Sequence, residues 1–262
     1  MKPKIIDTHC HLTDRRLAPR ADAVLASAAE AGVIAVISAG SSVADSAAAA
    51  ALARDHPAVY FTAGTQPHDA KDAPADYLDR IERLAGEPKC VAVGEIGLDY
   101  HHDLSPRDVQ RRVFAEQLAL ARRLGKPAVV HTREALDDTL AILAESGLDG
   151  HRVVFHSFTG RPEQTRRALA TGAMVSFSGI VTFAGSDAVR ASAALVPDDR
   201  LLVETDAPYL SPEPVRKIRP NTPAQVVHVA ACLAVVRGAD AGALAERATA
   251  NAAGFFALDI GP

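Results

Sequence analysis

The sequence predicts an α/β fold, a (β/α)8 TIM barrel with extra C-terminal helices. Eight short runs of apolar and β-branched residues follow one another along the chain, and seven longer amphipathic or alanine-rich segments lie between them. Strands that alternate with helices pair in parallel. Eight such units within about 210 residues are enough to close a parallel sheet into a barrel.

The elements follow from the apolar pattern in order. The expected strands are residues 4–7, 33–38, 59–62, 91–94, 128–130, 153–155, 174–176 and 201–203. The expected helices are residues 18–31, 43–53, 76–85, 109–124, 135–145, 163–170 and 187–195, with two more between residues 222 and 256. Gly32, Gly125 and Gly172 stand where left-handed helix C-caps favour glycine.

An open, doubly wound parallel sheet is the structural alternative to the barrel. Its dinucleotide-binding form lacks support, because no GxGxxG motif follows the first predicted strand. No linker interrupts the alternation of strands and helices, so we expect residues 1–262 to form a single domain.

The composition limits the class of protein. With 48% hydrophobic and 23% charged residues, the chain is typical of a globular protein rather than a disordered one. Its net charge of −4 argues against a protein that coats duplex nucleic acid through a broad basic surface. A local pocket that holds the end of one strand remains compatible with this charge.

Three cysteines occur, Cys10, Cys90 and Cys232, and none forms a CxxC pair. The odd number fits no disulfide framework, so Cys90 and Cys232 are expected as packed thiols in apolar runs. The first four residues, Met-Lys-Pro-Lys, lack the apolar stretch of a signal peptide, and no run approaches 18 apolar residues. These features predict a cytoplasmic protein without a membrane partner; they leave its oligomeric state open.

The most informative motif is Asp-Thr-His-Cys-His at residues 7–11, directly after the first apolar run. Side chains alternate between faces along a strand, so His9 and His11 point the same way, about 7 Å apart along the backbone. Two imidazoles on one face can chelate a divalent metal. Cys10 lies between them and points to the other side, so it is not expected to be a ligand.

Further potential ligands follow other predicted strands. Glu95 follows the fourth strand, His131 the fifth, His156 the sixth, and Asp206 lies just after the eighth. The C-terminal ends of barrel strands meet at one mouth, so these side chains are expected to converge there with His9 and His11. Four imidazoles and two carboxylates exceed one closed zinc site and suit two metals bridged by a carboxylate.

Each of these residues, taken singly, has a simpler explanation. A histidine after a strand is more often a hydrogen-bonded residue at the rim, and Glu95 alone could be an ion-pair partner. Asp206 alone could be a helix N-cap, because Pro208 follows it closely. The coincidence of all six with strand ends favours the metal site.

With these residues in place, the chain resembles the TatD family of metal-dependent hydrolases, in the amidohydrolase-like superfamily. The resemblance runs from residue 5 to about residue 256. It rests on five ordered motifs: DTHCHL at 7–12, GEIGLDY at 94–100, HTR at 131–133, HSFTG at 156–160 and ETDAPYL at 204–210. It implies a (β/α)8 barrel that binds divalent metals, with deoxyribonuclease activity among its members. It also implies that one metal is held by His9, His11 and Asp206, the second by His131 and His156, and that Glu95 bridges the two.

The sequence departs from the family pattern in two places. The family usually carries His-Pro-His after the third strand, where this chain has Gln66-Pro67-His68. Gln66 keeps an amide donor but cannot carry a proton or a positive charge. The family also tends to have an acidic residue before proline in the loop after the eighth strand, where this chain has Arg219-Pro220-Asn221-Thr222-Pro223. Both departures lie on the substrate side and leave the metal ligands intact.

The interpretation is therefore a two-metal hydrolase, a phosphodiesterase or deoxyribonuclease acting on nucleic-acid ends. The family resemblance implies DNA ends as the substrate. The metals are two divalent ions, drawn from Mg, Mn, Zn or Co. Asp206 is the candidate to take a proton from the attacking water, and Glu95 is catalytic as the bridge. The expected substrate contacts are Gln66, His68, Arg133, Arg216 and Lys217.

Two alternatives remain open from the sequence. The same site could hydrolyse an ester or amide, such as the aminoacyl bond of an aminoacyl-tRNA, although no aminoacyl pocket is recognisable. A barrel that keeps a metal site but serves as a scaffold is the non-enzymatic alternative, and the loss of a ligand would have favoured it. No ligand is lost.

Overall fold

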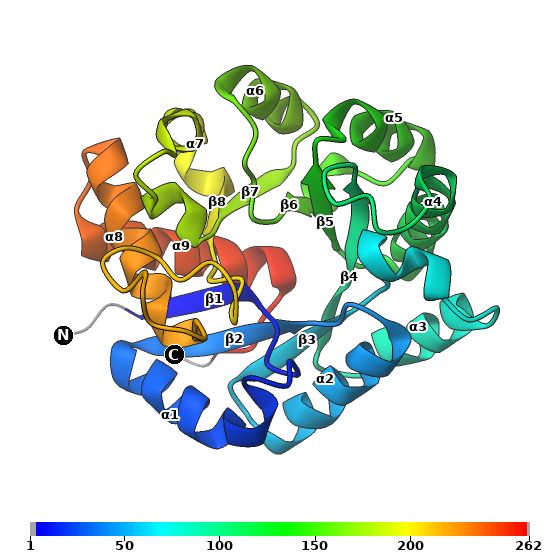
Figure 1. Cartoon of the computed structure of the whole chain (residues 1–262), viewed down its shortest axis with the longest axis horizontal. Helices are drawn as coiled ribbons and strands as arrows, with labels where there is room; N and C mark the ends of the chain where they lie inside the picture. The colour runs from blue at the N-terminus through cyan, green and yellow to red at the C-terminus, as the bar shows by residue number, and fades with distance from the viewer. Residues whose placement is uncertain (1–3, 261–262) are drawn as a thin grey trace. The chain divides into compact units, whose positions relative to one another are not determined.

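The computed structural model describes residues 4–260, and the chain has the (β/α)8 barrel fold that the sequence predicts. Its eight parallel strands follow one another in chain order, with helices between them (Figure 1). The chain divides into two compact units, which are described separately. Unit 1 contains residues up to 38, 157–170 and from 175 onward, and unit 2 contains residues 39–156 and 171–174. The N-terminal Met-Lys-Pro segment used for the localisation prediction lies outside the described residues.

Unit 1 combines segments from both ends of the chain. Its strands are β1 (Ile5–Cys10), β2 (Val33–Ala39), β7 (Met174–Phe177) and β8 (Leu201–Val203), and its helices are α1 (Ala21–Ala31), α6 (Pro162–Ala170), α7 (Asp187–Ala193), α8 (Val226–Arg237) and α9 (Ala241–Phe256). β1 pairs with β2, and β7 pairs with β8. The two helices predicted after the last strand are α8 and α9; they pack on each other, and α9 also packs against β1 and β8 (Figure 1).

Unit 2 is almost continuous in sequence. Its strands are β3 (Val59–Ala63), β4 (Cys90–Asp99), β5 (Ala128–Arg133) and β6 (Val153–Phe155), and its helices are α2 (Val43–Asp55), α3 (Tyr77–Ala85), α4 (Arg107–Leu124) and α5 (Leu136–Ser146). β4 lies between β3 and β5, and β5 pairs in turn with β6. A 3-10 helix that the sequence did not predict, Pro67–Asp72, follows β3.

Local sequence explains where several helices begin and end. Gly32 and Gly125 adopt the left-handed conformation after α1 and α4, as predicted. The side chain of Ser42 accepts a hydrogen bond from the backbone of Asp45 at the start of α2, and Asp240 does the same for Ala243 at the start of α9. Within residues 4–260, no single helix is long and apolar enough to cross a membrane; α8 with its preceding turn and α9 meet that criterion only together, with a bend of 112° between them.

Strands β1, β4 and β5 extend beyond the apolar runs that predicted them. β4 runs on to Asp99, so Glu95 lies inside this strand rather than after it. The strand is irregular at this point, because its register with β5 shifts between Val93 and Ile96. Gly97 has φ +138°, and an added Cβ would lie 2.0 Å from the backbone oxygen of His131, so only glycine fits there.

Candidate metal centre

Unit 1 brings His9, His11 and Asp206 together, as predicted. We call these residues the first cluster. Their ligand atoms lie within 4.8 Å of one another. Asp206 Oδ1 is 3.3 Å from Nε2 of His11 and 4.0 Å from Nε2 of His9. His9 lies in β1 and is buried, whereas His11 follows the strand and is partly exposed.

Backbone contacts between the end of β1 and the segment after β8 hold the first cluster in place. The backbone N–H of Asp206 donates to the carbonyl of His9 at 2.9 Å, and that of His11 donates to the carbonyl of Ala207 at 2.6 Å. The buried carboxyl of Asp7 accepts from the backbone N–H of Thr205 at 2.9 Å and from its hydroxyl. Burial raises the pKa of Asp7 to about 8, although the bonds from Thr205 act in the opposite direction.

Unit 2 brings Glu95, His131 and His156 together, also as predicted. We call these residues the second cluster. Oε1 of Glu95 lies 3.1 Å from Nδ1 of His131 and 3.1 Å from Nε2 of His156, and the two imidazole nitrogens are 3.0 Å apart. Glu95 and His156 are buried, and His131 is partly exposed. Burial alone would lower the pKa of His131, but its contacts with Asp99 and Glu95 outweigh this and raise it.

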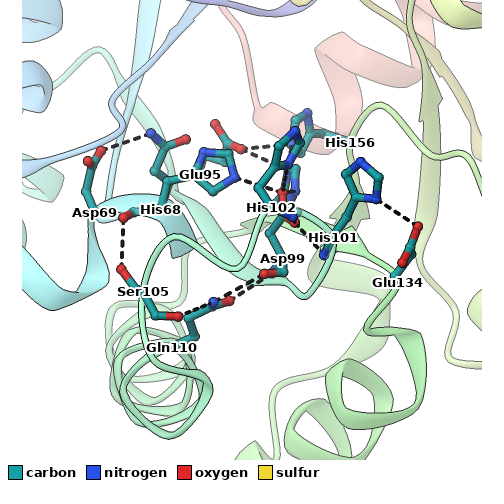
Figure 2. A network of polar contacts seen from close by, with 12 residues as sticks. His68, Asp69, Glu95, Asp99, His101, His102, Ser105, Gln110, Glu134 and His156 are labelled. Atoms are coloured by element: carbon teal, nitrogen blue, oxygen red, sulfur yellow. Dashed lines mark hydrogen bonds and ion pairs between the residues drawn. The ribbon is translucent and has the colours of Figure 1, made fainter.

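Asp99, at the end of β4, lies among several histidines (Figure 2). The sequence interpretation assigned His68 and His131 to the site but not Asp99, His101 or His102. Its Oδ2 lies 2.8 Å from Nε2 of His68, 2.8 Å from Nδ1 of His102 and 3.2 Å from Nε2 of His131. Burial would raise the pKa of Asp99, but these contacts outweigh it and hold the pKa well below its usual range. A fourth histidine, His101, points instead to Glu134, with Nδ1 2.9 Å from Oε1.

A signal for Asp99 was present in the sequence. Asp99 follows Glu95 by four residues, and side chains at i and i+4 of a strand lie on the same face. The predicted strand ended at residue 94, so this relation between the two carboxylates could not be seen.

The predicted substrate residues lie in different surroundings. In unit 2, the amide of Gln66 donates to Asp69 at 2.9 Å, and Arg133 is the last residue of β5. In unit 1, the guanidinium of Arg216 lies 3.8 Å from the ring centre of Phe183, and Lys217 is exposed. A second stacked pair in unit 1, which was not predicted, places Arg16 4.4 Å from the ring centre of Tyr209, whose ring is also beside that of His11.

The donor sets of both clusters fit divalent metals. Ligand atoms bound to one ion at about 2.0–2.2 Å lie roughly 3.0–3.5 Å apart when their angles at the ion are 90–109°. The three separations in the second cluster, 3.0, 3.1 and 3.1 Å, fall in this range. The first cluster is slightly wider, with 3.3 and 4.0 Å to Asp206, which a small side-chain rotation would close. Mixed imidazole and carboxylate ligands suit Zn, Mn and Co in particular.

Comparison with known proteins agrees with this geometry. A family described as TatD related DNase matches residues 6–257. The uncharacterized metal-dependent hydrolase YcfH of Escherichia coli K12 is 39% identical over 97% of this chain and 96% of its own length. The 3'-5' ssDNA/RNA exonuclease TatD of Erwinia tasmaniensis is 36% identical over 97% of this chain and 100% of its own. The crystal structure of YjjV, a TatD homolog from Escherichia coli K12, superposes with a TM-score of 0.92 at 30% identity, covering 98% of this chain and 100% of that one.

Proposed function

Because the chain belongs to the TatD family of metal-dependent hydrolases, we propose that it hydrolyses phosphodiester bonds at the ends of nucleic-acid strands and uses two divalent ions to do so. The observation that carries this proposal is the pair of three-residue clusters, each with two imidazoles and one carboxylate. In a (β/α)8 barrel the active site is built at the C-terminal ends of the strands, and the residues of each cluster lie in the C-terminal half of a strand of its own unit or just beyond its end.

In this proposal each ligand has a defined role. His9, His11 and Asp206 hold one ion, His131 and His156 hold the other, and Glu95 is shared by both. Bound divalent ions polarise a phosphoryl oxygen and make a water molecule easier to deprotonate. Asp206 accepts that proton through its carboxylate, because it is the more exposed of the two catalytic carboxylates, at 16% against 4% for Glu95.

In this proposal, cationic and polar side chains bind the substrate. The phosphate groups are held by Arg133, Arg216 and Lys217. Gln66 and His68 provide further polar contacts to the substrate. The stacking of Arg216 on Phe183 supports this role, since it fixes a flexible guanidinium in one orientation before substrate arrives.

Two features favour strand ends over long tracts of nucleic acid. The net charge of −4 provides no broad basic surface, and the chain has no tryptophan and only 5% aromatic residues, so an extended stacking platform is not available. Several curated relatives are named as exonucleases acting on single-stranded DNA and RNA, which supports the same substrate class.

The test is a turnover assay on protein that has been stripped with a chelator and reloaded with Mg²⁺, Mn²⁺, Co²⁺ or Zn²⁺ in turn. The substrates are a single-stranded oligonucleotide, a blunt duplex and an aminoacyl ester, with Asp206→Asn as the inactive control. We expect metal-dependent release of nucleotides from single-stranded ends, which the control lacks. Rapid hydrolysis of the aminoacyl ester with negligible nucleotide release would replace the nuclease assignment with the ester hydrolase. No turnover of either, in metal-loaded protein, would favour the scaffold.

A further inference from the structure

The carboxylate of Asp99 is approached by more nitrogen atoms than it has lone-pair sites. Its Oδ1 accepts the backbone N–H groups of His101 and His102, at 2.9 and 2.8 Å. Its Oδ2 is approached by three imidazole nitrogens, those of His68, His102 and His131, at 2.8, 2.8 and 3.2 Å (Figure 2). A carboxylate offers about four lone-pair sites, two on each oxygen. Five nitrogen atoms therefore face about four sites, and the excess falls on Oδ2.

One of the three imidazoles, that of His131, is expected to donate a hydrogen bond to Oδ2. In the proposed function, on which this step rests, Nδ1 of His131 binds a metal ion, so its Nε2 carries the proton and donates to Asp99, the arrangement that commonly orients a metal-binding histidine. One lone pair of Oδ2 then remains for two nitrogens, those of His68 and His102. A nitrogen that presents its own lone pair to Oδ2 at 2.8 Å would be repelled by it.

We propose that His68, Asp99 and His102 bind a further divalent cation, separate from the ions assigned to the first and second clusters. A cation resolves this excess of nitrogen atoms. Oδ2 keeps its bond to His131 and gives its second lone pair to the ion, while Nε2 of His68 and Nδ1 of His102 act as ligands. Each has its ligand atom 2.8 Å from Oδ2, a spacing close to the roughly 3.0 Å of neighbouring ligands on one ion.

The residues define the chemistry of the cation. Two imidazoles and one carboxylate suit Zn²⁺, Co²⁺, Ni²⁺ or Mn²⁺ better than Ca²⁺ or Mg²⁺, which favour oxygen ligands. Three protein ligands leave open positions on the ion. Asp99 is completely buried, but the side chain of His68 is 26% exposed and that of His102 is 54% exposed, so the ion could exchange with solvent. This assignment gives His68 a role that needs no direct contact with substrate.

The alternative is a metal-free network in which Asp99 is simply surrounded by hydrogen-bonded imidazoles. The chain supplies a matched control that separates the two. His101 is adjacent to His102 in sequence, with ring centres 4.8 Å apart, and its side chain is 46% exposed. Its imidazole nevertheless contacts Glu134 instead of Asp99, so replacing this side chain leaves the proposed ligands and the backbone bond to Asp99 intact.

The experiment is equilibrium dialysis of the full chain against Zn²⁺, followed by measurement of protein-bound zinc by mass spectrometry. The variants are His68→Gln and His102→Asn, whose amides occupy the positions of Nε2 and Nδ1, with His101→Asn as the control. Because free Zn²⁺ stays present throughout, weakly held ions are counted. We expect wild type and His101→Asn to bind one ion per chain more than either His68→Gln or His102→Asn.

The readout also separates this proposal from the proposed function. Glu95→Gln, measured in parallel, should reduce binding at the shared site and leave the ion at Asp99 in place. If Glu95→Gln loses zinc while His102→Asn and His68→Gln bind as much as wild type, the further site is wrong and the two-metal site stands. If His102→Asn and His68→Gln each lose one ion and Glu95→Gln loses none, the further site stands and the shared two-metal site is wrong. Equal thermal unfolding temperatures of His101→Asn and His102→Asn would confirm that both variants are folded, so that their zinc contents can be compared.

Discussion

At the scale of single residues, two fully buried carboxylates, one in each compact unit, have opposite properties. Asp7 is enclosed with only Thr205 and the backbone to stabilise its charge, and burial raises its pKa to about 8. Asp99 is equally buried, but imidazoles converge on it and its pKa lies well below the usual range. The environment of each carboxylate, rather than its residue type, therefore decides whether it is held neutral or charged.

Glu95→Gln tests the carboxylate assigned to both ions. The amide keeps the shape of the side chain but removes the negative charge that lies 3.1 Å from His131 and from His156. We expect kcat to fall at least ~100-fold with saturating metal, a typical effect of losing a key electrostatic group, while the thermal unfolding temperature stays near that of wild type. Glu134→Gln, at an exposed acid beside His101, serves as the control and should leave kcat unchanged. Near-normal turnover in Glu95→Gln would mean that this residue is not the bridge.

The proposed function gives the loop cations Arg216 and Lys217 a role in substrate binding rather than in the chemical step. If Arg216 and Lys217 hold phosphate equally well in the ground and transition states, replacing both with glutamine should raise KM for an oligonucleotide more than it lowers kcat. Steady-state kinetics on one short single strand measures both constants. Arg219→Gln removes an exposed charge from the same loop and should leave KM within about two-fold of wild type. An unchanged KM in the double variant would show that Arg216 and Lys217 are solvated surface charges that do not bind the substrate.

The buried thiols predict how the protein responds to alkaline pH. Burial raises the pKa of Cys90 to about 12 and that of Cys10 well above its usual value, so both stay neutral in the folded protein at pH 8. Because the unfolded thiol ionises near pH ~8.5, this contribution to stability is complete below that pH and is lost as pH rises toward the folded pKa. We expect iodoacetamide at pH 8 to label Cys10 and Cys90 only after denaturation, as read by mass spectrometry. Labelling of either thiol in the native protein at the rate of a free cysteine would contradict this.

At the scale of elements, the sequence predicted the position of every strand but not the full length of those that carry the site. The apolar runs locate β4 and β5, yet β4 continues for five residues past Gly94 and β5 continues through His131 to Arg133. These extensions contain polar residues, so hydrophobic patterning does not mark them. They stay in the sheet because Gly97, Leu98 and Asp99 pair with residues of β5. The six candidate ligands could be proposed from the sequence because each stands next to an apolar run; Asp99, His101 and His102 were missed because they belong to the extension and the turn after it.

Replacing either of two glycines with alanine adds one methyl group, and we expect opposite effects on the free energy of unfolding. Gly254 is exposed within α9, and an added Cβ would meet nothing within 4 Å. Gly254→Ala should therefore stabilise the fold by about 0.5–1 kcal/mol, through helix propensity and reduced freedom of the unfolded chain. Gly97→Ala places a Cβ against the backbone of His131 at φ +138° and should destabilise the fold by more than ~2 kcal/mol. Urea unfolding of both variants measures the two changes, and equal effects would refute the geometry described for β4.

At the scale of the whole molecule, the expectation of a single domain remains a prediction. The chain divides into two compact units, and each contains four of the eight strands or the greater part of them. Neither unit is a continuous stretch of sequence, because unit 1 is formed from three segments and unit 2 from two. A unit assembled in this way is expected to depend on the rest of the chain to bring its segments together.

Calorimetry tests whether the units unfold as one. We expect one heat-capacity peak for the metal-loaded protein, with a calorimetric enthalpy equal to the van't Hoff enthalpy. The same agreement should hold for Gly254→Ala, which changes stability without changing the units. Two resolved peaks, or a calorimetric enthalpy about twice the van't Hoff value, would identify units 1 and 2 as separate domains.

The division of the chain also sets the order in which its parts can form during synthesis. Asp7 and Thr205, which hold the first cluster together, are separated by 198 residues. At a translation rate of about 5–20 residues per second, the ribosome needs roughly 10–40 s to travel from His11 to Asp206. During that interval the ribosome synthesises the strands of unit 2 and every residue of the second cluster. The first cluster cannot form until Asp206 has also been synthesised. His9 and His11 are thus synthesised roughly 10–40 s before Asp206, the carboxylate that lies beside them in the folded protein.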